Sequence, residues 1–185
     1  MQKLVSTLMI LTSIIVTGQT KKTHNLDLTE SVINWKGTYA FLFSEHTGTV
    51  HFKEGELQTN DGHITGGTFV IDMTTISNED YLSKRGAVAH LRDTDFFDVT
   101  KYPTATLEIT NVIYHANYNE HKIEANLTIK GITRPINFIA FVDTDAKRMI
   151  TKFKIDRTRW GITYNNKVKN KAIAEAIEFN VLLQF

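Results

Sequence analysis

The chain has 185 residues and a formal net charge of +1, with 42% hydrophobic and 22% charged residues, an ordinary globular composition. This length suggests one domain. Because the net charge is so small, no strong field attracts nucleic acid or an anionic surface, and we expect no nucleic-acid partner. The sequence contains no cysteine, which excludes disulfides, thiolate catalysis and metal centres with cysteine ligands.

The first residues have the pattern of a secretory signal peptide. Lys3 precedes a mostly apolar run of 13 residues, Leu4–Val16, which is too short to span a bilayer. Short residues follow, so we expect cleavage after Gly18. Residues 1–18 would then be removed, and residues 19–185 would form an exported domain, periplasmic or secreted, without a transmembrane segment. The alternative is an uncleaved helix that lies on a membrane surface.

Most of the remaining sequence alternates apolar and polar residues with the period of β-strands. The clearest example is residues 104–110, where Leu107 and Ile109 share one face. Asp61-Gly62 predicts a hairpin turn, because both residues tolerate a positive φ. Gly66-Gly67 predicts the kind of bend or bulge that a closing barrel needs.

About eight short strands joined by short turns predict an antiparallel sandwich or barrel, and the local pattern does not separate the two. One segment differs from the rest. Its apolar residues fall near helical spacing, and it predicts a short helix over roughly residues 79–91.

Three long stretches resemble the YceI-like family in their order and spacing: HLRDTDFFDVTKYPTATLEI, LTIKGITRPINF and KIDRTRWGITYN. GGTFVIDMTTI is also similar to its equivalent there, and the likeness runs from about Ser31 to Phe185. The resemblance implies an all-β fold, a lipocalin-like, eight-stranded antiparallel β-barrel with one short helix. It also implies an exported protein that binds a polyisoprenoid or related lipid in the barrel. The sequence departs from the family before His90, where GAVA separates Arg85 from the His-Leu pair, so Arg85 is assigned no role.

The apolar strand faces and the resemblance together predict an interior lipid site. The candidate ligand-binding residues are Trp35, Phe43, Phe69, Ile71, Phe96, Leu107, Ile109, Leu127, Ile129, Phe138, Phe153, Ile155, Trp160, Phe179 and Val181. The alternative is a filled core, because an eight-stranded barrel either fills with side chains or holds one small ligand. The sequence does not measure the remaining volume.

Phe96 and Phe97 stand among acidic residues just before a strand. We expect this segment to cover one opening of the barrel. Adjacent side chains of an extended chain point in opposite directions, so one ring should face the barrel and the other should pack under the helix.

The motif DRTRWG, residues 156–161, carries two arginines with two alternative roles. Arg157 or Arg159 could bind a phosphate or another polar head group in a bidentate manner. In the structural alternative, Arg159 stacks on Trp160 and pairs with Asp156.

Neither metal nor catalytic chemistry is indicated. No histidine pair, such as His115 and His121, has the spacing of metal ligands, and the common nucleophile and nucleotide-binding motifs are missing. We therefore expect a binding protein, not an enzyme, with no cofactor and no metal, that sequesters or transports a long-chain isoprenoid or similar lipid. One alternative is an interaction protein with a filled barrel, whose outer face carries Asn137, Ile139 and Phe141. The other alternative is an enzyme that modifies a lipid inside the barrel.

The predicted signal peptide gives a first testable prediction. The protein recovered from the periplasm or medium of its own host should begin near Gln19, because the apolar run directs secretion and is then removed. N-terminal sequencing measures this directly. A cytoplasmic chain that still carries Met1 would contradict the prediction.

Overall fold

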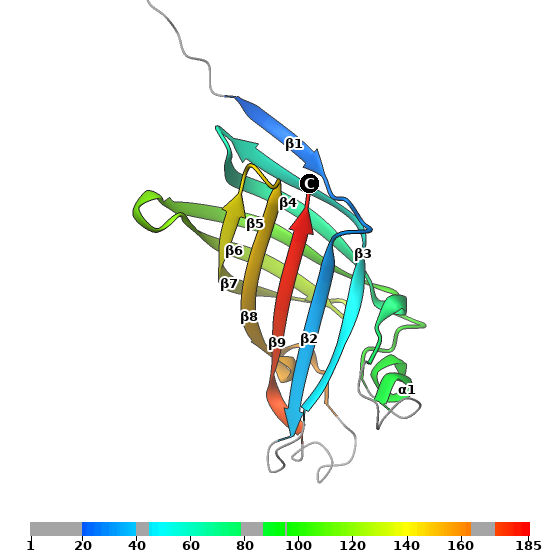
Figure 1. Cartoon of the computed structure of the whole chain (residues 1–185). Helices are drawn as coiled ribbons and strands as arrows, with labels where there is room; N and C mark the ends of the chain where they lie inside the picture. Colours follow the sequence, from blue (N-terminus) through cyan, green and yellow to red (C-terminus); the bar gives the residue numbers. More distant parts are fainter. Residues whose placement is uncertain (1–19, 40–44, 79–86, 95, 164–172) are drawn as a thin grey trace, which may run out of the picture.

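Antiparallel strands form one sheet that closes on itself in the computed structural model, which describes residues 20–39, 45–78, 87–94, 96–163 and 173–185. Within these residues the strand order is β1-β3-β2-β9-β8-β7-β6-β5-β4, and a β3–β4 pairing completes the ring. Strands β2 to β9 therefore make an eight-stranded antiparallel barrel, and β1 lies on the edge of β3 (Figure 1). The predicted all-β barrel with one short helix is confirmed.

The strands are β1 (Lys21–Asn25), β2 (Val32–Tyr39), β3 (Glu45–Asn60), β4 (His63–Asp72), β5 (Thr104–His115), β6 (Glu120–Ile129), β7 (Ile132–Asp143), β8 (Arg148–Asp156) and β9 (Ile173–Gln184). The helical elements are η1 (Met73–Thr75), α1 (Ala87–Arg92), η2 (Ala116–Tyr118) and η3 (Arg157–Trp160).

Residues with a left-handed backbone conformation form the turns of two hairpins. Asp61 and Gly62, with φ of 49° and 84°, join β3 to β4, as the sequence predicts. Lys130 and Gly131, with φ of 51° and 72°, join β6 to β7 in the same way. Two consecutive residues with positive φ match the right-handed twist of the flanking strands.

Irregularities in the register bend the sheet toward closure. The β3–β4 pairing shifts between Gln58 and Thr59, opposite Gly66 and Ile64, which confirms the predicted bulge near Gly66-Gly67. The β5–β6 pairing shifts after Ile109. Bulges of this kind bend a strand and increase its twist, so the sheet curls into a barrel.

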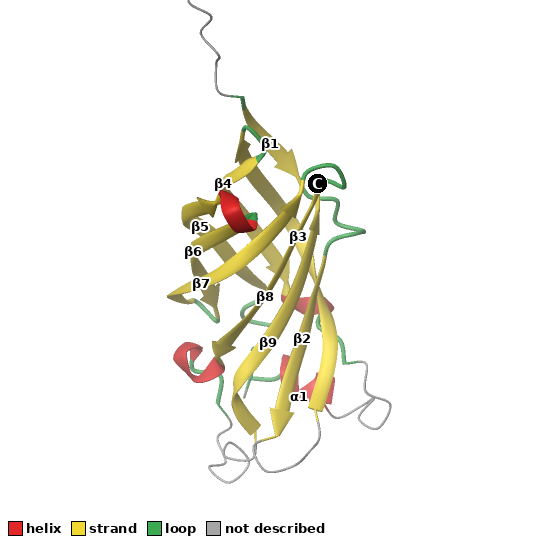
Figure 2. Ribbon diagram, turned by 60° about the vertical axis from the view of Figure 1, so that its left-hand side comes forward, coloured by secondary structure: helices red, strands yellow, loops and turns green. Residues whose placement is uncertain are grey.

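The helix α1 lies at the lower end of the barrel in the view of Figure 1, and Figure 2 shows the same placement after rotation. It overlaps the second half of the predicted helix and extends one residue beyond it, to Arg92, while residues 79–86 of the prediction are outside the described part of the chain. The Arg92 guanidinium fastens it to η1 and to the residue that follows η1, by donating to the carbonyl oxygens of Thr74 at 2.8 Å and Ile76 at 3.0 Å. No helix in the described residues is long and apolar enough to cross a membrane.

The close contact at Gly48 gives a stability prediction. A Cβ at this position would overlap the Ser77 carbonyl oxygen and lie 2.8 Å from Cζ2 of Trp35. That oxygen is held in place because the Trp35 indole donates to it at 3.1 Å. We expect Gly48→Ala to lower the free energy of unfolding by roughly 1–3 kcal/mol, measured by urea denaturation.

Gly37→Ala is the matched control, since its Cβ would meet only the flexible Cδ1 end of Ile177, at 3.3 Å. It should leave the unfolding midpoint nearly unchanged. Equal midpoints for Gly48→Ala and the parent protein would show that the Ser77 segment can move aside.

Candidate functional site

An apolar cavity lies inside the barrel, on the side of α1 and η3. Its volume, counted as the space open to the centres of water molecules, is about 140 Å³. Every strand from β2 to β9 contributes to its wall. All of the predicted binding residues that the structure describes, except Trp160, line this cavity: Trp35, Phe69, Ile71, Phe96, Leu107, Ile109, Leu127, Ile129, Phe138, Phe153, Ile155, Phe179 and Val181. Phe43 lies outside the described residues.

The cavity is long and narrow. Ile177, Phe179, Val181 and Leu183 line it in succession along β9. These residues are six positions apart from first to last, which corresponds to a length of roughly 20 Å at about 3.3 Å per residue. A volume of about 140 Å³ spread over that length leaves a channel about one hydrocarbon chain wide.

Stacked aromatic rings make one wall where the strand pairing ends. β7 pairs with β8 only from Ala140 to Asp143. Next to this short ladder, the rings of Phe138 and Phe153 stack with centroids 4.9 Å apart, and Phe153 and Phe179 lie 5.4 Å apart. Phe153 and Phe179 point inward yet are only half-buried, as expected of side chains that face a hollow.

Phe96 and Phe97 both line the cavity, so the prediction that the two rings point in opposite directions is wrong. That prediction assumed an extended backbone. The segment instead forms a compact turn, in which the Phe96 amide donates to the Asp93 carbonyl at 3.0 Å and the Phe97 amide to the Leu91 carbonyl at 3.1 Å. The turn lets both rings close the same side of the lumen, with their centroids 6.1 Å apart.

Arg157 is the one charged side chain among the described lining residues, and it is 1% exposed. Its guanidinium donates to the carbonyl oxygens of Ala174 at 3.1 Å, Ile173 at 3.2 Å and Ile162. It also lies 5.9 Å from the ring centre of Phe96. These bonds tie η3 to the start of β9 and hold a positive charge at one end of the apolar channel.

The second arginine of the motif, Arg159, packs against the barrel wall and does not line the cavity. Arg159 lies over the Trp160 ring at 5.4 Å and donates to the Pro135 carbonyl at 3.3 Å. The predicted stack on Trp160 is therefore confirmed. The predicted pair with Asp156 is wrong, because the Asp156 carboxylate accepts instead from the backbone amide and hydroxyl of Thr158, at 2.9 and 2.6 Å.

Trp160 does not line the cavity. Its side chain is fully buried, and its indole nitrogen donates to the Leu127 carbonyl at 3.0 Å. This bond holds the ring against the backbone of β6, away from the lumen. Arg134 supports the same region, since its Nε donates to the Arg159 carbonyl at 3.1 Å.

Several lining residues are absent from the sequence-based set: Ile33, Val50, Phe52, Met73, Ile76, Leu91, Phe97, Ala105, Met149, Thr151, Arg157, Ile162 and Ile177. Those on strands carry the same alternation that identified the others. Ile76 and Ile162 lie in irregular segments, where no periodicity marks an inward side chain.

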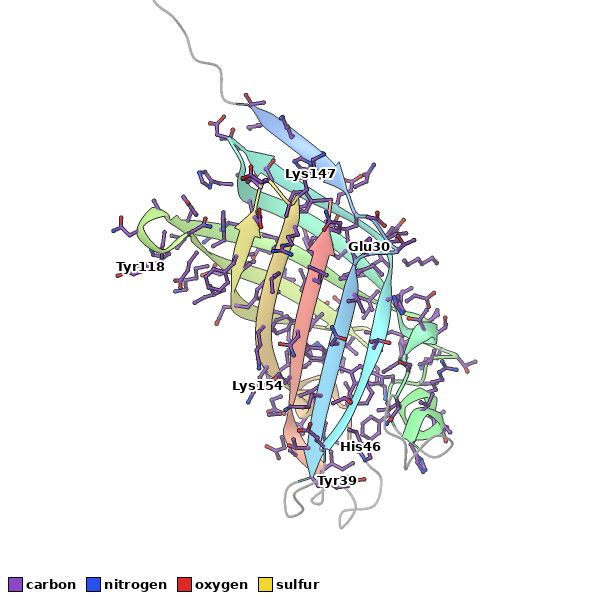
Figure 3. The ribbon with its side chains drawn as sticks, in the orientation of Figure 1. Glu30, Tyr39, His46, Tyr118, Lys147 and Lys154 are labelled. Carbon is purple, nitrogen blue, oxygen red and sulfur yellow. The ribbon has the colours of Figure 1, made fainter. Side chains whose placement is uncertain are left out.

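The lower rim of the barrel is polar. Figure 3 shows Tyr39 and His46 at the ends of β2 and β3, and the His46 Nε2 lies 2.8 Å from the Tyr39 hydroxyl. Close by, the Lys36 ammonium pairs with the Glu45 carboxylate at 3.0 Å. Polar groups on β2 and β3 thus lie at the end of the barrel nearest to the cavity.

The opposite end of the lumen is filled and contains a buried histidine. His121 is 1% exposed, and neither ring nitrogen has a well-formed hydrogen bond to any described residue. Its ring lies 4.6 Å from that of Tyr114 and 5.8 Å from that of His63. Burial lowers the pKa of His121 to about 4, the charge of His63 adds to the shift, and the nearby backbone of Ala140 opposes it in part. No group of three or more potential metal ligands occurs among the described residues.

The closed antiparallel ring and its channel place this protein in the class of lipocalin-like barrels with a hollow, apolar interior. The chain belongs to the YceI-like family: the model of the YceI-like domain matches residues 24–185.

Relatives agree with this assignment over part of their length. A UPF0312 protein of Vibrio cholerae is 30% identical over 113 residues, which cover 57% of this chain and 58% of the relative. A UPF0312 protein of Pseudomonas aeruginosa is 32% identical over 98 residues, or 53% of this chain and 46% of the relative. The chain spans about half the length of the curated relatives it matches.

Two solved structures share the fold. The Burkholderia cenocepacia protein BcnA has a TM-score of 0.71 at 16% identity, covering 85% of this chain and 98% of BcnA. A Saccharophagus degradans domain, described as a polyisoprenoid binding domain implicated in plant cell wall breakdown, has a TM-score of 0.57 at 14% identity, with 86% and 95% covered. At these identities the likeness concerns the fold alone.

His121 makes stability depend on pH. Its folded pKa of about 4 is below the ordinary value of 6.5, so the unfolded chain binds more protons below pH 6.5. Stability should therefore fall as the pH falls from about 6.5 to about 4, by about 3 kcal/mol in total from this group.

The measurement is urea denaturation across this pH range, with His121→Phe beside the parent protein. The variant keeps an aromatic ring but cannot be protonated, so its stability should fall less steeply over the range. Identical pH profiles would show that His121 acquires a proton without opposing folding.

Proposed function

We propose that this protein holds a long-chain isoprenoid or a similar apolar lipid inside its barrel, as an exported carrier that sequesters or transports the lipid. The observation that carries the proposal is the channel about 20 Å long and one chain wide. The polyisoprenoid binding domain with the same fold supports this class of ligand.

The energetics favour a long chain over a short one. Burying about 400 Å² of lipid tail gains roughly 10 kcal/mol at ~25 cal/mol per Å². Association costs roughly 4–15 kcal/mol, because translational and rotational freedom is lost and side chains become ordered. A short tail would therefore bind weakly, while a tail that fills the channel would be retained.

The distribution of polar groups sets the orientation that we propose. The channel wall is hydrocarbon and aromatic over most of its length, and the buried hydroxyl of Thr151 is engaged with the Ile139 carbonyl at 2.7 Å. Arg157 lies at the end near α1 and η3, and the polar rim residues of β2 and β3 lie at the same end. The tail would lie in the channel, and the polar end of the lipid would stay near the rim. We propose no reaction, because the described lining contains no carboxylate, imidazole or thiol.

The outer face of β7 and β8 favours a second candidate function. Ile139, Phe141 and Ile150 are 44%, 49% and 47% exposed, and Phe141 pairs directly with Ile150. An interaction protein would use such a face to bind a partner and would carry no lipid.

Native mass spectrometry of the protein purified from its own host separates these functions. We expect an adduct in the mass range of a lipid, released by organic extraction. A bare chain would favour the interaction protein, and a chemically altered lipid would favour an enzyme.

Phe179→Ala tests the channel itself. Phe179 lines the cavity, so part of its surface lacks protein contacts, and truncation should reduce lipid retention more than it reduces thermal stability. A filled core would instead lose about 3–5 kcal/mol. Glu108→Ala, on the exposed face of β5, should change neither quantity. Severe destabilisation of Phe179→Ala, with no lipid in the parent protein, would refute the carrier proposal.

A further inference from the structure

The lumen changes from hollow to filled at the upper end of β8. Met149 and Leu183 face each other across the β8–β9 pairing, both are 2% exposed, and both line the cavity. Val142, the partner of Met149 on β7, is also buried but does not line the cavity. The end of the channel therefore lies against Met149.

The region behind Met149 is tightly packed. Leu57, Ile123 and Ala140 are all 0% exposed, Ile64 is 2% exposed, and none of them lines the cavity. The β7–β8 hairpin is fastened to the end of β9 beside this region, because the side-chain amide of Gln184 donates to the Ala146 carbonyl, and the Phe185 amide to the Lys147 carbonyl, each at 2.8 Å. Lys147 lies at this end of the barrel, in the upper part of Figure 3.

Met149 is also the most adaptable part of this end wall. Its side chain is unbranched and has three rotatable bonds, so it fills an irregular space without fixed polar contacts. Neighbouring groups are held more firmly. Thr151, the next inward residue of β8, is fixed by its hydroxyl bond to the Ile139 carbonyl at 2.7 Å.

We propose that Met149 sets the length of the apolar chain that the barrel accepts. This inference rests on the proposed function and adds the position where the end of the lipid tail stops. A smaller residue at 149 lengthens the channel, and a larger residue shortens it.

The experiment measures chain-length preference on the delipidated full chain. An equimolar mixture of all-trans farnesol, geranylgeraniol and solanesol competes for the protein, and native mass spectrometry reports the bound ratio. Met149→Ala should shift this ratio toward the longer alcohols by at least about tenfold, the discrimination that one methylene can give in an apolar pocket. Met149→Trp should shift it toward the shorter ones, and Met149→Leu should keep the ratio of the parent protein.

Two controls separate a change in length from general damage. Ile64→Ala removes a comparable buried side chain that does not line the cavity, so it should lower the melting temperature without changing the ratio. Ile150→Ala alters the neighbouring outward side chain, which is 47% exposed, and should change neither. If Met149→Trp does not fold, Met149→Ala alone decides the question.

Different outcomes overturn different proposals. A folded Met149→Ala protein with the parental ratio, or one that binds none of the alcohols, overturns the assignment of Met149. An equal shift in Ile64→Ala also overturns it. A parent protein that binds no prenyl alcohol overturns the proposed function itself.

Discussion

Closure of the sheet through the β3–β4 pairing is the constraint on which the rest of the structure depends. Because β4 pairs with β3 as well as with β5, the eight barrel strands each have two neighbours, and their inward faces surround one lumen. Bulges in β3–β4 and β5–β6 supply the necessary curvature. The outward residues then meet solvent, so each strand presents one face to each environment.

Once the ring is closed, the sizes of the inward side chains decide how much of the lumen stays empty. Leu57 and Ile123 are fully buried in the filled end, whereas the adjacent rings of Phe138, Phe153 and Phe179 form a wall beside a channel. Side chains that line an empty space lack dispersion partners on one side. An apolar chain in the channel would supply those contacts, and this is the physical reason why a lipid would stabilise the barrel.

Burial of a polar side chain inside the barrel costs free energy, and three side chains reduce this cost in different ways. Arg157 keeps its charge and donates to backbone carbonyls at the η3–β9 junction. Thr151 uses its hydroxyl within the sheet, through the Ile139 carbonyl. His121 has no well-formed hydrogen bond to any described residue, and burial lowers its pKa to about 4, which favours its neutral form. Each solution avoids an uncompensated charge in the interior, which would oppose folding strongly.

The sequence by itself determined which residues face inward on the regular strands and where the β3–β4 hairpin turns, because period-2 alternation and the positive φ of Asp61-Gly62 are local properties. The resemblance of its motifs to the YceI-like family predicted that these strands close into a barrel. Only the tertiary structure decided that the lumen is partly hollow, that Met149 lies at its end, that Phe96 and Phe97 share one side and that Trp160 stays outside the channel. These features depend on the register and volume of side chains that are distant in the sequence, and on turns whose backbone has no repeating period.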